Sequence, residues 1–365
     1  MMNVAIVHDW LVTNAGAEKV LSALIELFPN ADLFSIVEFL DESSKREILQ
    51  DIHVTTSFIQ HLPFSKKHFR KYLLLFPKAI ASFDLKKYDL ILSSSWAFAK
   101  GIRKDENQIH ICYCHTPIRY IWDLKDEYFR NIPTLFYPLA QTTAKYLQQW
   151  DLQTSKSVDH FIANSHFVKK RIQNIYNRDA TVIYPPVDTT SFTLCKEKED
   201  YYVTMSRLVP YKRVDLIVQA FAKNGKRLLV IGDGEERKRL EAMAAKNIEF
   251  KGWIQKEEVI ATLQKAKGFV YAAIEDFGIA PVEAQACGTP IIALGMGGTA
   301  ESVIDGITGV HFHKQSIEAL QKAVEHFESI YDTFDFTTIA NHAKSFSKER
   351  FMKEMQTFIK EKAYH

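Results

Sequence analysis

Short apolar runs rich in β-branched residues alternate with helix-like segments along almost the whole 365-residue chain. Strands buried on both faces form continuous apolar runs, and the helices between them supply the crossovers that parallel strands need. Two such series follow one another, so the sequence predicts an α/β fold with two doubly wound parallel sheets. The expected strands are 4–7, 89–92, 109–113, 160–163 and 181–184 in the first series and 202–205, 228–231, 248–250, 268–272 and 290–293 in the second.

A pair of prolines marks the expected boundary between the two series. Pro185 and Pro186 exclude a helix or a central strand and favour an extended connection. We therefore expect a first domain over 1–186 and a second over 187–343. The last segment, 344–365, contains an amphipathic helical pattern, and we expect it to pack back on the first domain.

Charge and composition exclude several classes of protein. The chain has 46 Lys and Arg against 44 Asp and Glu, a net charge of +2, whereas a domain that wraps nucleic acid carries a larger basic excess. Four scattered cysteines are too few for a disulfide scaffold and lack the spacing of a zinc site. We therefore expect no nucleic-acid partner, and reduced thiols that fit a reducing compartment.

We expect neither a signal peptide nor a membrane-spanning helix. His8 and Asp9 interrupt the first apolar run, and no run reaches the roughly 18 apolar residues that a spanning helix needs. This favours a cytoplasmic protein, either soluble or peripheral on the inner face of the cytoplasmic membrane. The segment from Ser65 to Lys78 keeps both alternatives open, because it mixes five Lys or Arg residues with an apolar patch. It is either a surface helix with snorkelling lysines or a surface for an anionic membrane or a lipid-linked ligand.

The segment 275–290 has the pattern of a loop and a short helix that directly follow a buried strand. Pro281 is typical of a first helical turn, where its missing N–H costs nothing. The loop before it should direct free backbone N–H groups past the carboxyl edge of the sheet, where anionic or polyhydroxyl ligands bind. Its residues are Phe277, Gly278 and Ile279. Glu275 and Glu283 would hold two different parts of one ligand, although a carboxylate at the position of Glu283 is favourable near a helix N-terminus without any function.

Two cations follow the first strand of the second series. Arg207 and Lys212 stand five residues apart, just after Ser206, where the strand 202–205 ends. A guanidinium fork together with a compact ammonium charge suits a diphosphate. The alternative is a pair of surface cations on a solvated loop.

Two motifs of cofactor-dependent enzymes are incomplete or missing. Gly232-Asp233-Gly234 begins a nicotinamide fingerprint, but Arg237 stands at its last glycine position. The sequence contains no Asp-x-Asp, the motif by which many nucleotide-sugar enzymes hold a divalent metal on the diphosphate. We therefore expect no metal and no cofactor, with protein cations in the place of the metal.

Two features of the first series also point to a ligand. Gly16 lies in a turn of small residues that begins at Asn14 and joins the first strand to the first helix, which allows a ligand to approach the backbone closely. His115 ends the strand 109–114, a position suited to a cleft at the sheet edge. The alternative is a histidine that is hydrogen-bonded within the fold.

The order of these motifs resembles that of retaining glycosyltransferases of family 4, which have the GT-B fold of two Rossmann-like domains facing a central cleft. The resemblance rests on Glu275-x7-Glu283, Ser206-Arg207-Leu208 with Lys212, Gly232-Asp233-Gly234, Gly252-Trp253 and Gly297-Gly298-x-x-Glu301. His8-Asp9-Trp10, Ser93-Ser94-Ser95 and the run 114–123 further resemble a mannosyltransferase subgroup of bacterial O-antigen and exopolysaccharide assembly. One departure is Ala15-Gly16, where the family has a pair of glycines.

The resemblance implies that 1–186 is the acceptor side and that 187–343 binds the nucleotide sugar. The donor would contact Gly16, Ser206, Arg207, Lys212, Ile254, Glu275, Phe277, Gly278, Ile279 and Glu283. Catalysis would depend on His115, Glu275, Arg207 and Lys212, and the acceptor side would include Asp9, Asn14 and His115. The two cations would neutralise the diphosphate, and Glu283 would hold the ribose. Glu275 and the loop N–H groups would hold the donor sugar, and His115 would contact this sugar near the reacting carbon. Ile254 would lie near the base.

The function implied is transfer of a hexose, mannose from GDP-mannose foremost, to a glycan or lipid-linked sugar in cell-surface polysaccharide synthesis. A UDP-sugar donor is the alternative within the same class. Two alternatives of another class are an NAD-dependent sugar-modifying enzyme and a non-catalytic sugar-binding subunit. A front-side route and a covalent intermediate both remain open for the chemistry.

Overall fold

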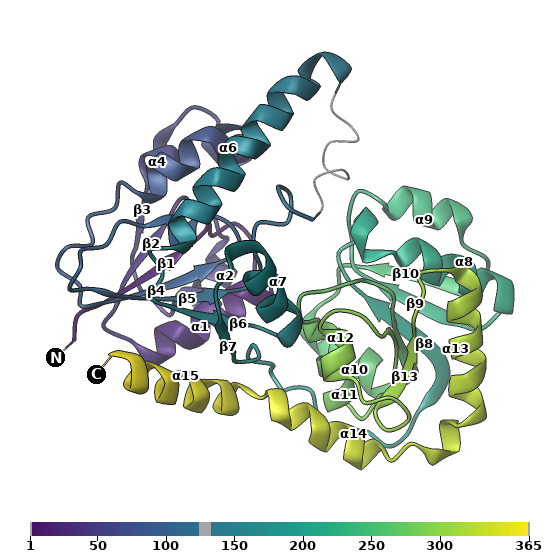
Figure 1. Ribbon diagram of the computed structural model, residues 1–365. Helices are drawn as coiled ribbons and strands as arrows, with labels where there is room; N and C mark the ends of the chain where they lie inside the picture. The colour runs from purple at the N-terminus through teal and green to yellow at the C-terminus, as the bar shows by residue number, and fades with distance from the viewer. Residues whose placement is uncertain (1, 124–132, 364–365) are drawn as a thin grey trace. The chain divides into compact units, whose positions relative to one another are not determined.

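The chain folds into two compact units in the computed structural model, which describes residues 2–123 and 133–363. The first unit comprises 1–185 and 351–365, and the second comprises 186–350. Each unit has a parallel sheet with helices on both faces (Figure 1). The predicted fold class, an α/β protein with two doubly wound sheets, is confirmed.

The described part of the first unit has a seven-stranded sheet in the order β3-β2-β1-β4-β5-β6-β7, and its paired strands are parallel. Its strands are β1 (Val4–His8), β2 (Asp32–Ser35), β3 (Val54–Thr56), β4 (Leu90–Ser95), β5 (Ile109–Cys114), β6 (His160–Ala163) and β7 (Ala180–Val182). The strand order reverses between β1 and β4. The loops that follow these two strands therefore diverge, and a crevice at this point is the usual ligand site of such sheets.

Side chains of the first sheet alternate between two cores. Ile6 and Leu92 belong to the core that also contains α1 (Gly16–Leu27) and α15 (Lys348–Ala363), whereas Val7 and Ile91 belong to the core on the other face. The C-terminal helix α15 thus belongs to the first unit and runs beside α1 in Figure 1. Burial on both faces is the reason that these strands form uninterrupted apolar runs.

The second unit has a six-stranded sheet in the order β10-β9-β8-β11-β12-β13, again with parallel pairs. Its strands are β8 (Glu199–Met205), β9 (Leu228–Ile231), β10 (Ile248–Gly252), β11 (Ala266–Tyr271), β12 (Ile291–Leu294) and β13 (Gly309–Phe312). Its order reverses between β8 and β11. The helices α8 (Val214–Asn224) and α13 (Ile317–Ser329) pack together on one face.

Serine caps begin two of the helices. Ser165 and Ser316 cap α7 and α13, because their hydroxyls accept the backbone N–H groups three residues later. The other α-helices are α2 (Glu42–Leu49), α3 (Ser65–His68), α4 (Phe76–Ile80), α6 (Tyr137–Ser155), α7 (His166–Tyr176), α9 (Arg237–Met243), α10 (Lys256–Lys265), α11 (Ile279–Ala286), α12 (Thr299–Ser302) and α14 (Phe336–Ala343). None of these described helices is long and apolar enough to cross a membrane.

Two expectations about local structure need correction. The sequence did not predict β2, β3 or β13, because none of these short strands contains three consecutive apolar residues. The segment 65–78 is not one helix but α3, the 3₁₀ helix η2 (Phe69–Leu75) and the start of α4. Tyr72 has non-helical backbone angles within η2, and Pro77 fits only a first helical turn.

A buried ion pair fixes the loop after β4 to helix α6. Lys100 is 2% exposed and pairs with the fully buried carboxylate of Asp151. That carboxylate also accepts hydrogen bonds from Trp122 Nε1 at 2.8 Å and from the Tyr176 hydroxyl at 2.9 Å. Burial alone would lower the pKa of Lys100, but Asp151 holds it above its ordinary value. The lysine therefore stays charged inside the fold.

We expect Lys100→Ala to lower the free energy of unfolding by about 3–5 kcal/mol, because it leaves the Asp151 carboxylate buried and uncompensated. Lys169→Ala removes the partner of the exposed Asp179 carboxylate and is the matched control, with an expected change within about 0.5 kcal/mol. Urea unfolding of both variants measures the difference. Equal midpoints for the two variants would contradict the structural importance of the buried pair.

Candidate functional site

The predicted donor residues of the second unit gather at one edge of its sheet. Parallel strands bring their carboxyl ends to the same edge, and β8 and β11 are neighbours at the point where the strand order reverses. Residues 206–212 follow β8, and residues 275–279 follow β11. The structure therefore places two motifs that lie more than sixty residues apart in sequence beside each other.

Lys212 and Glu275 form an ion pair at this edge. Both side chains are about one-sixth exposed, and Lys212 Nζ also lies 3.4 Å from the Tyr271 hydroxyl. Burial alone would lower the pKa of Lys212, but the Glu275 carboxylate raises it above its ordinary value. The lysine is therefore a fixed cation, held by a carboxylate that itself belongs to the predicted site.

Arg207 and Ser206 offer unused polar groups in the same segment after β8 that carries Lys212. The Arg207 side chain is exposed, and no residue within 2–123 and 133–363 forms an ion pair with it. The Ser206 hydroxyl is buried and has no hydrogen-bond partner among the described residues. A guanidinium and a hydroxyl that are available beside a fixed ammonium group suit an anionic ligand.

Gly232 and Gly234 allow two loops at this edge to pack closely against each other. A Cβ on Gly232 would lie 1.9 Å from the Ser206 carbonyl oxygen, and one on Gly234 would lie 2.2 Å from that of Leu208. Gly232 also has a φ of +127°, which side chains other than glycine rarely adopt. The string that begins like a nicotinamide fingerprint thus lets the loop after β9 pack on the backbone after β8.

A second pair of glycines supports Glu275. A Cβ on Gly297 would lie 2.4 Å from the Glu275 carbonyl oxygen, and one on Gly298 would lie 2.2 Å from Phe277 Cα. The Gly298 N–H also donates to the Glu275 carbonyl at 2.8 Å. These glycines therefore set the backbone position of the loop that carries Glu275.

The loop 277–279 leads directly into helix α11. Gly278 is the residue before the helix and has a φ of +88°, with no side-chain cap on the helix N-terminus. Phe277 is buried against Phe346, with ring centroids 5.4 Å apart, so its side chain anchors the loop. Glu283 is 6% exposed within α11. Ile254 is half-buried just after β10, at the same carboxyl edge of the sheet.

In the first unit, His115 lies at the carboxyl edge next to the reversal between β1 and β4. Its Nε2 is 2.8 Å from the Ser94 hydroxyl, and its ring contacts Tyr113 and Trp96 with centroids 5.1 and 5.8 Å apart. Only 8% of the residue is exposed. Burial lowers the pKa of His115 to about 3, with His8 adding to the effect, so the imidazole is neutral near pH 7.

The other predicted residues of the first unit have different surroundings. Asp9 is fully buried, and its carboxylate accepts four backbone N–H groups from residues 96–99. A carboxylate in that position holds the loop after β4. Asn14 is exposed and donates to Glu47 on α2 at 2.7 Å. Gly16 is the first residue of α1.

The sequence did not predict three buried polar residues that connect to His115, namely Ser94, His8 and Glu18. His8 and Ser94 are fully buried, and Glu18 is 2% exposed. The resemblance already named the strings around His8 and Ser94, but it assigned these two residues no role. The available signal was their position at strand ends, because polar side chains there need partners within the fold.

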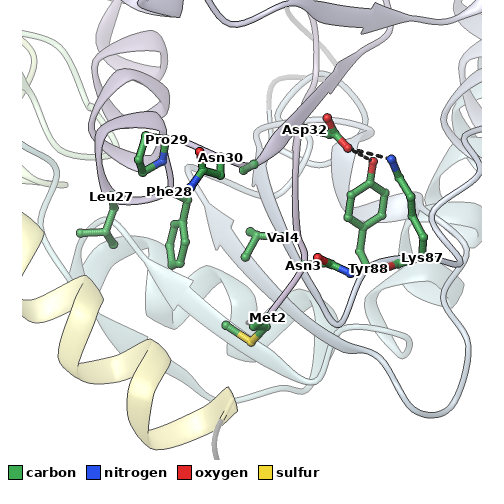
Figure 2. A pocket seen from close by; sticks show the side chains of 11 residues that line it. Met2, Asn3, Val4, Leu27, Phe28, Pro29, Asn30, Asp32, Lys87 and Tyr88 are labelled. Carbon is green, nitrogen blue, oxygen red and sulfur yellow. Dashed lines mark hydrogen bonds and ion pairs between the residues drawn. The ribbon is translucent and has the colours of Figure 1, made fainter.

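A separate hollow lies at the opposite edge of the first sheet, where β1 and β2 begin. Figure 2 shows Tyr88 and Lys87 reaching Asp32 at its rim, with contacts of 2.5 and 3.0 Å. None of the predicted site residues lines this hollow. It therefore has no part in the site at the carboxyl edge.

The fold of the whole chain is that of GT-B glycosyltransferases. The crystal structure of Anabaena HepE in complex with UDP and glucose has a TM-score of 0.73 and 17% sequence identity, with 98% of this chain and 99% of that chain covered. Sucrose-phosphate synthase from Thermosynechococcus elongatus has a TM-score of 0.72 at 16% identity, with 99% of both chains covered. These structures show that the chain has the two-unit GT-B fold.

Two family models match successive parts of the chain. The model described as Glycosyltransferase Family 4 matches residues 15–191, and the model described as Glycosyl transferases group 1 matches residues 189–338. The chain belongs to the group 1 glycosyltransferases of family 4. The predicted family is confirmed.

Curated relatives agree with this family at low identity. An uncharacterized glycosyltransferase of Methanocaldococcus jannaschii is 31% identical over 52% of this chain and 55% of its own length. The O-antigen chain mannosyltransferase RfbU of Salmonella typhimurium is 25% identical over 67% of this chain and 74% of its own. A GDP-mannose-dependent phosphatidylinositol monomannoside mannosyltransferase of Mycolicibacterium smegmatis is 29% identical over 44% of this chain and 50% of its own. The chain thus spans about half the length of the first and third of these relatives.

The buried, neutral His115 predicts a loss of stability in mild acid. The unfolded chain binds a proton at this position below about pH 6.5, whereas the folded chain does not bind it until about pH 3. The unfolded state therefore binds more protons, and stability falls as the pH falls through this window. We expect His115→Asn to reduce the loss of unfolding free energy between pH 7 and pH 5 by about 2 kcal/mol. Urea titrations at both pH values measure it.

His68→Gln is the control for this prediction, because His68 is exposed on α3. It should leave the pH dependence of the wild type unchanged. An identical pH dependence for wild type and His115→Asn would mean that His115 is accessible to protons in the folded chain.

Proposed function

We propose that this glycosyltransferase moves a hexose, mannose from GDP-mannose foremost, to a glycan or lipid-linked sugar in cell-surface polysaccharide synthesis. We further propose that the reaction retains the anomeric configuration and needs no metal. The names of the Salmonella and Mycolicibacterium relatives support mannose and GDP-mannose. The observation that carries the proposal is the Lys212–Glu275 pair beside an exposed Arg207 at the reversal of the second sheet.

The chemistry follows from where charge develops. The bond between the anomeric carbon and the diphosphate oxygen breaks, the acceptor hydroxyl oxygen bonds to the same carbon, and its proton leaves with the diphosphate. Negative charge on the leaving diphosphate is stabilised by fixed cations that need no reorganisation. In our proposal Arg207 and Lys212 supply these cations, and the two side chains take the place of a divalent metal.

Glu275 would position the donor sugar and the lysine. Its carboxylate is already neutralised by Lys212, and such a carboxylate is a weak nucleophile. This supports a role in which Glu275 holds sugar hydroxyls, and it disfavours a role in which Glu275 forms a covalent intermediate. The backbone N–H groups at the start of α11 would hold further oxygens of the donor, and Glu283 would hold the ribose. In the first unit, His115 would contact the sugar near the reacting carbon.

Arg207→Ala tests the role of the cations, because it removes an exposed side chain that forms no ion pair with the described residues. We expect kcat/KM for sugar transfer to fall by about 100-fold or more, since removal of one group that stabilises the transition state has this effect. The melting temperature of the free protein should stay within the range of a surface substitution. Lys265→Ala on α10 is the matched control and should leave kcat/KM unchanged. Full activity of Arg207→Ala would contradict the diphosphate role.

Donor identity is tested by thermal unfolding with GDP-mannose, UDP-glucose, UDP-GlcNAc, ADP-glucose and NAD, each with and without EDTA. A ligand that binds only the folded state raises the melting temperature. A shift with GDP-mannose that survives EDTA supports the proposal. A shift with a UDP-sugar alone would mean that the donor is a UDP-sugar and not GDP-mannose. A shift abolished by EDTA contradicts metal independence, and a shift with NAD alone contradicts the enzyme class.

We also propose that the first unit contacts an anionic membrane. The basic–apolar surface comprises Phe64, Lys66, Lys67, Arg70, Lys71, Leu74 and Leu75, and all of these residues are exposed. Phe64 is 82% exposed, whereas Phe69 and Phe76 anchor the segment in the core. Exposed apolar side chains among four cations suit the interface of a bilayer that contains anionic lipids.

Vesicle co-sedimentation tests this membrane contact. We expect binding to vesicles of phosphatidylglycerol and phosphatidylcholine at low salt, weaker binding at high salt, and none to phosphatidylcholine alone. Lys66→Glu with Lys71→Glu should weaken binding at least about tenfold, since each cation near the surface contributes about 1 kcal/mol. The same charge change at Lys251 and Lys265 of the second unit is the control. Equal loss in both double variants would show that only net charge matters.

A further inference from the structure

Four buried polar side chains of the first unit form a continuous chain that ends at His115. Glu18 Oε1 lies 3.9 Å from His8 Nε2, and His8 Nδ1 lies 3.1 Å from the Ser94 hydroxyl. The same hydroxyl lies 2.8 Å from His115 Nε2. The first three residues are 0–2% exposed and His115 is 8% exposed. The chain therefore links α1, β1 and β4 to the residue proposed to contact the substrate.

The single proton of the Ser94 hydroxyl couples the two histidines. Ser94 can donate to one imidazole while it accepts an N–H from the other. If Ser94 donates to His8 Nδ1, then His115 must carry its proton on Nε2, and His8 carries its proton on Nε2 as well. If Ser94 donates to His115 Nε2, both histidines carry their proton on Nδ1. The tautomer of His8 thus determines the tautomer of His115.

Glu18 distinguishes these two states. Its carboxylate is the third residue of α1, where the helix dipole favours a negative charge, and its other oxygen accepts the Ala15 N–H at 3.1 Å. His8 Nε2 is buried and has no hydrogen-bond partner among the described residues, so its nearest ionic neighbour is this carboxylate. An N–H at Nε2 directs its positive end toward the carboxylate, whereas a lone pair there would face a like charge in a site of low dielectric.

We propose that Glu18, acting through His8 and Ser94, fixes His115 as the Nε2–H tautomer, so that an unprotonated Nδ1 accepts a hydrogen bond from a hydroxyl of the substrate sugar. This deepens the proposed function and rests on the proposed contact of His115 with the substrate. Glu18, His8 and Ser94 are then positioning residues. Because Glu18 also holds the Ala15 N–H, one side chain connects the loop 14–16 with the tautomer of His115.

The test is the imidazole nitrogen spectrum of the full chain labelled with ¹⁵N-histidine at pH 7. Long-range proton–nitrogen correlations distinguish the two tautomers, and His115→Asn assigns the His115 signals. We expect the Nε2–H tautomer in the wild type. Ser94→Ala and Glu18→Gln should raise the fraction of the Nδ1–H tautomer and lower kcat by about 10–100-fold, as loss of an orienting partner typically does.

Two variants separate this effect from a general change of structure. Ser94→Thr keeps a hydroxyl and should restore the wild-type tautomer and most of the activity. Ser93→Ala is the matched control on the same strand, because its hydroxyl bonds His110 Nε2 at 2.7 Å and takes no part in the chain. It should leave the His115 tautomer unchanged.

Three outcomes would overturn the proposal. An Nδ1–H tautomer of His115 in the wild type contradicts it directly, and this result needs no variant to fold. An unchanged tautomer in Glu18→Gln removes the role of Glu18. Full transfer activity of His115→Asn, with the wild-type tautomer as expected, contradicts the substrate contact of His115 and leaves the glycosyltransferase assignment intact.

Discussion

Parallel strand pairing is the constraint on which the whole site depends. It brings the carboxyl ends of all strands in a unit to one edge, and the reversal of strand order opens that edge at one point. In the second unit this point lies between β8 and β11, which is where Lys212 and Glu275 meet. In the first unit it lies between β1 and β4, which is where His8 and Ser94 meet. The same rule of topology therefore locates both sets of polar groups.

The sequence predicted that the motifs at 206–212 and 275–279 each follow a strand, because those strands have a clear apolar pattern. It did not predict that Lys212 would pair with Glu275, since that contact depends on the strand order β8-β11 and not on spacing. Nor did it predict why Gly232 is a glycine. Its place resembles the start of a nicotinamide fingerprint, yet the structural reason is that a Cβ at this position would overlap the backbone of Ser206.

In the first unit the sequence predicted fewer of the side-chain contacts, because these contacts again depend on the tertiary structure. Asp9 stands in a motif and at a strand end, which led to the prediction of a place on the acceptor side. The sequence did not predict that its carboxylate satisfies four N–H groups of the next loop, because no local pattern reveals that demand. The short strands β2, β3 and β13 were missed because none of them contains three consecutive apolar residues, whereas the equally short β9 and β12 consist of four.

The charges of the second unit imply an order of events under the proposed function. Before a donor binds, Glu275 balances the charge of Lys212. Of the two proposed diphosphate cations, only Arg207 is exposed. A diphosphate that reaches Arg207 first brings negative charge next to Lys212 and so competes with Glu275 for it. A carboxylate released in this way needs new donors at once, because it is mostly buried. The hydroxyls of the donor sugar are donors of this kind, so binding of the diphosphate and capture of the sugar would be coupled through one ion pair.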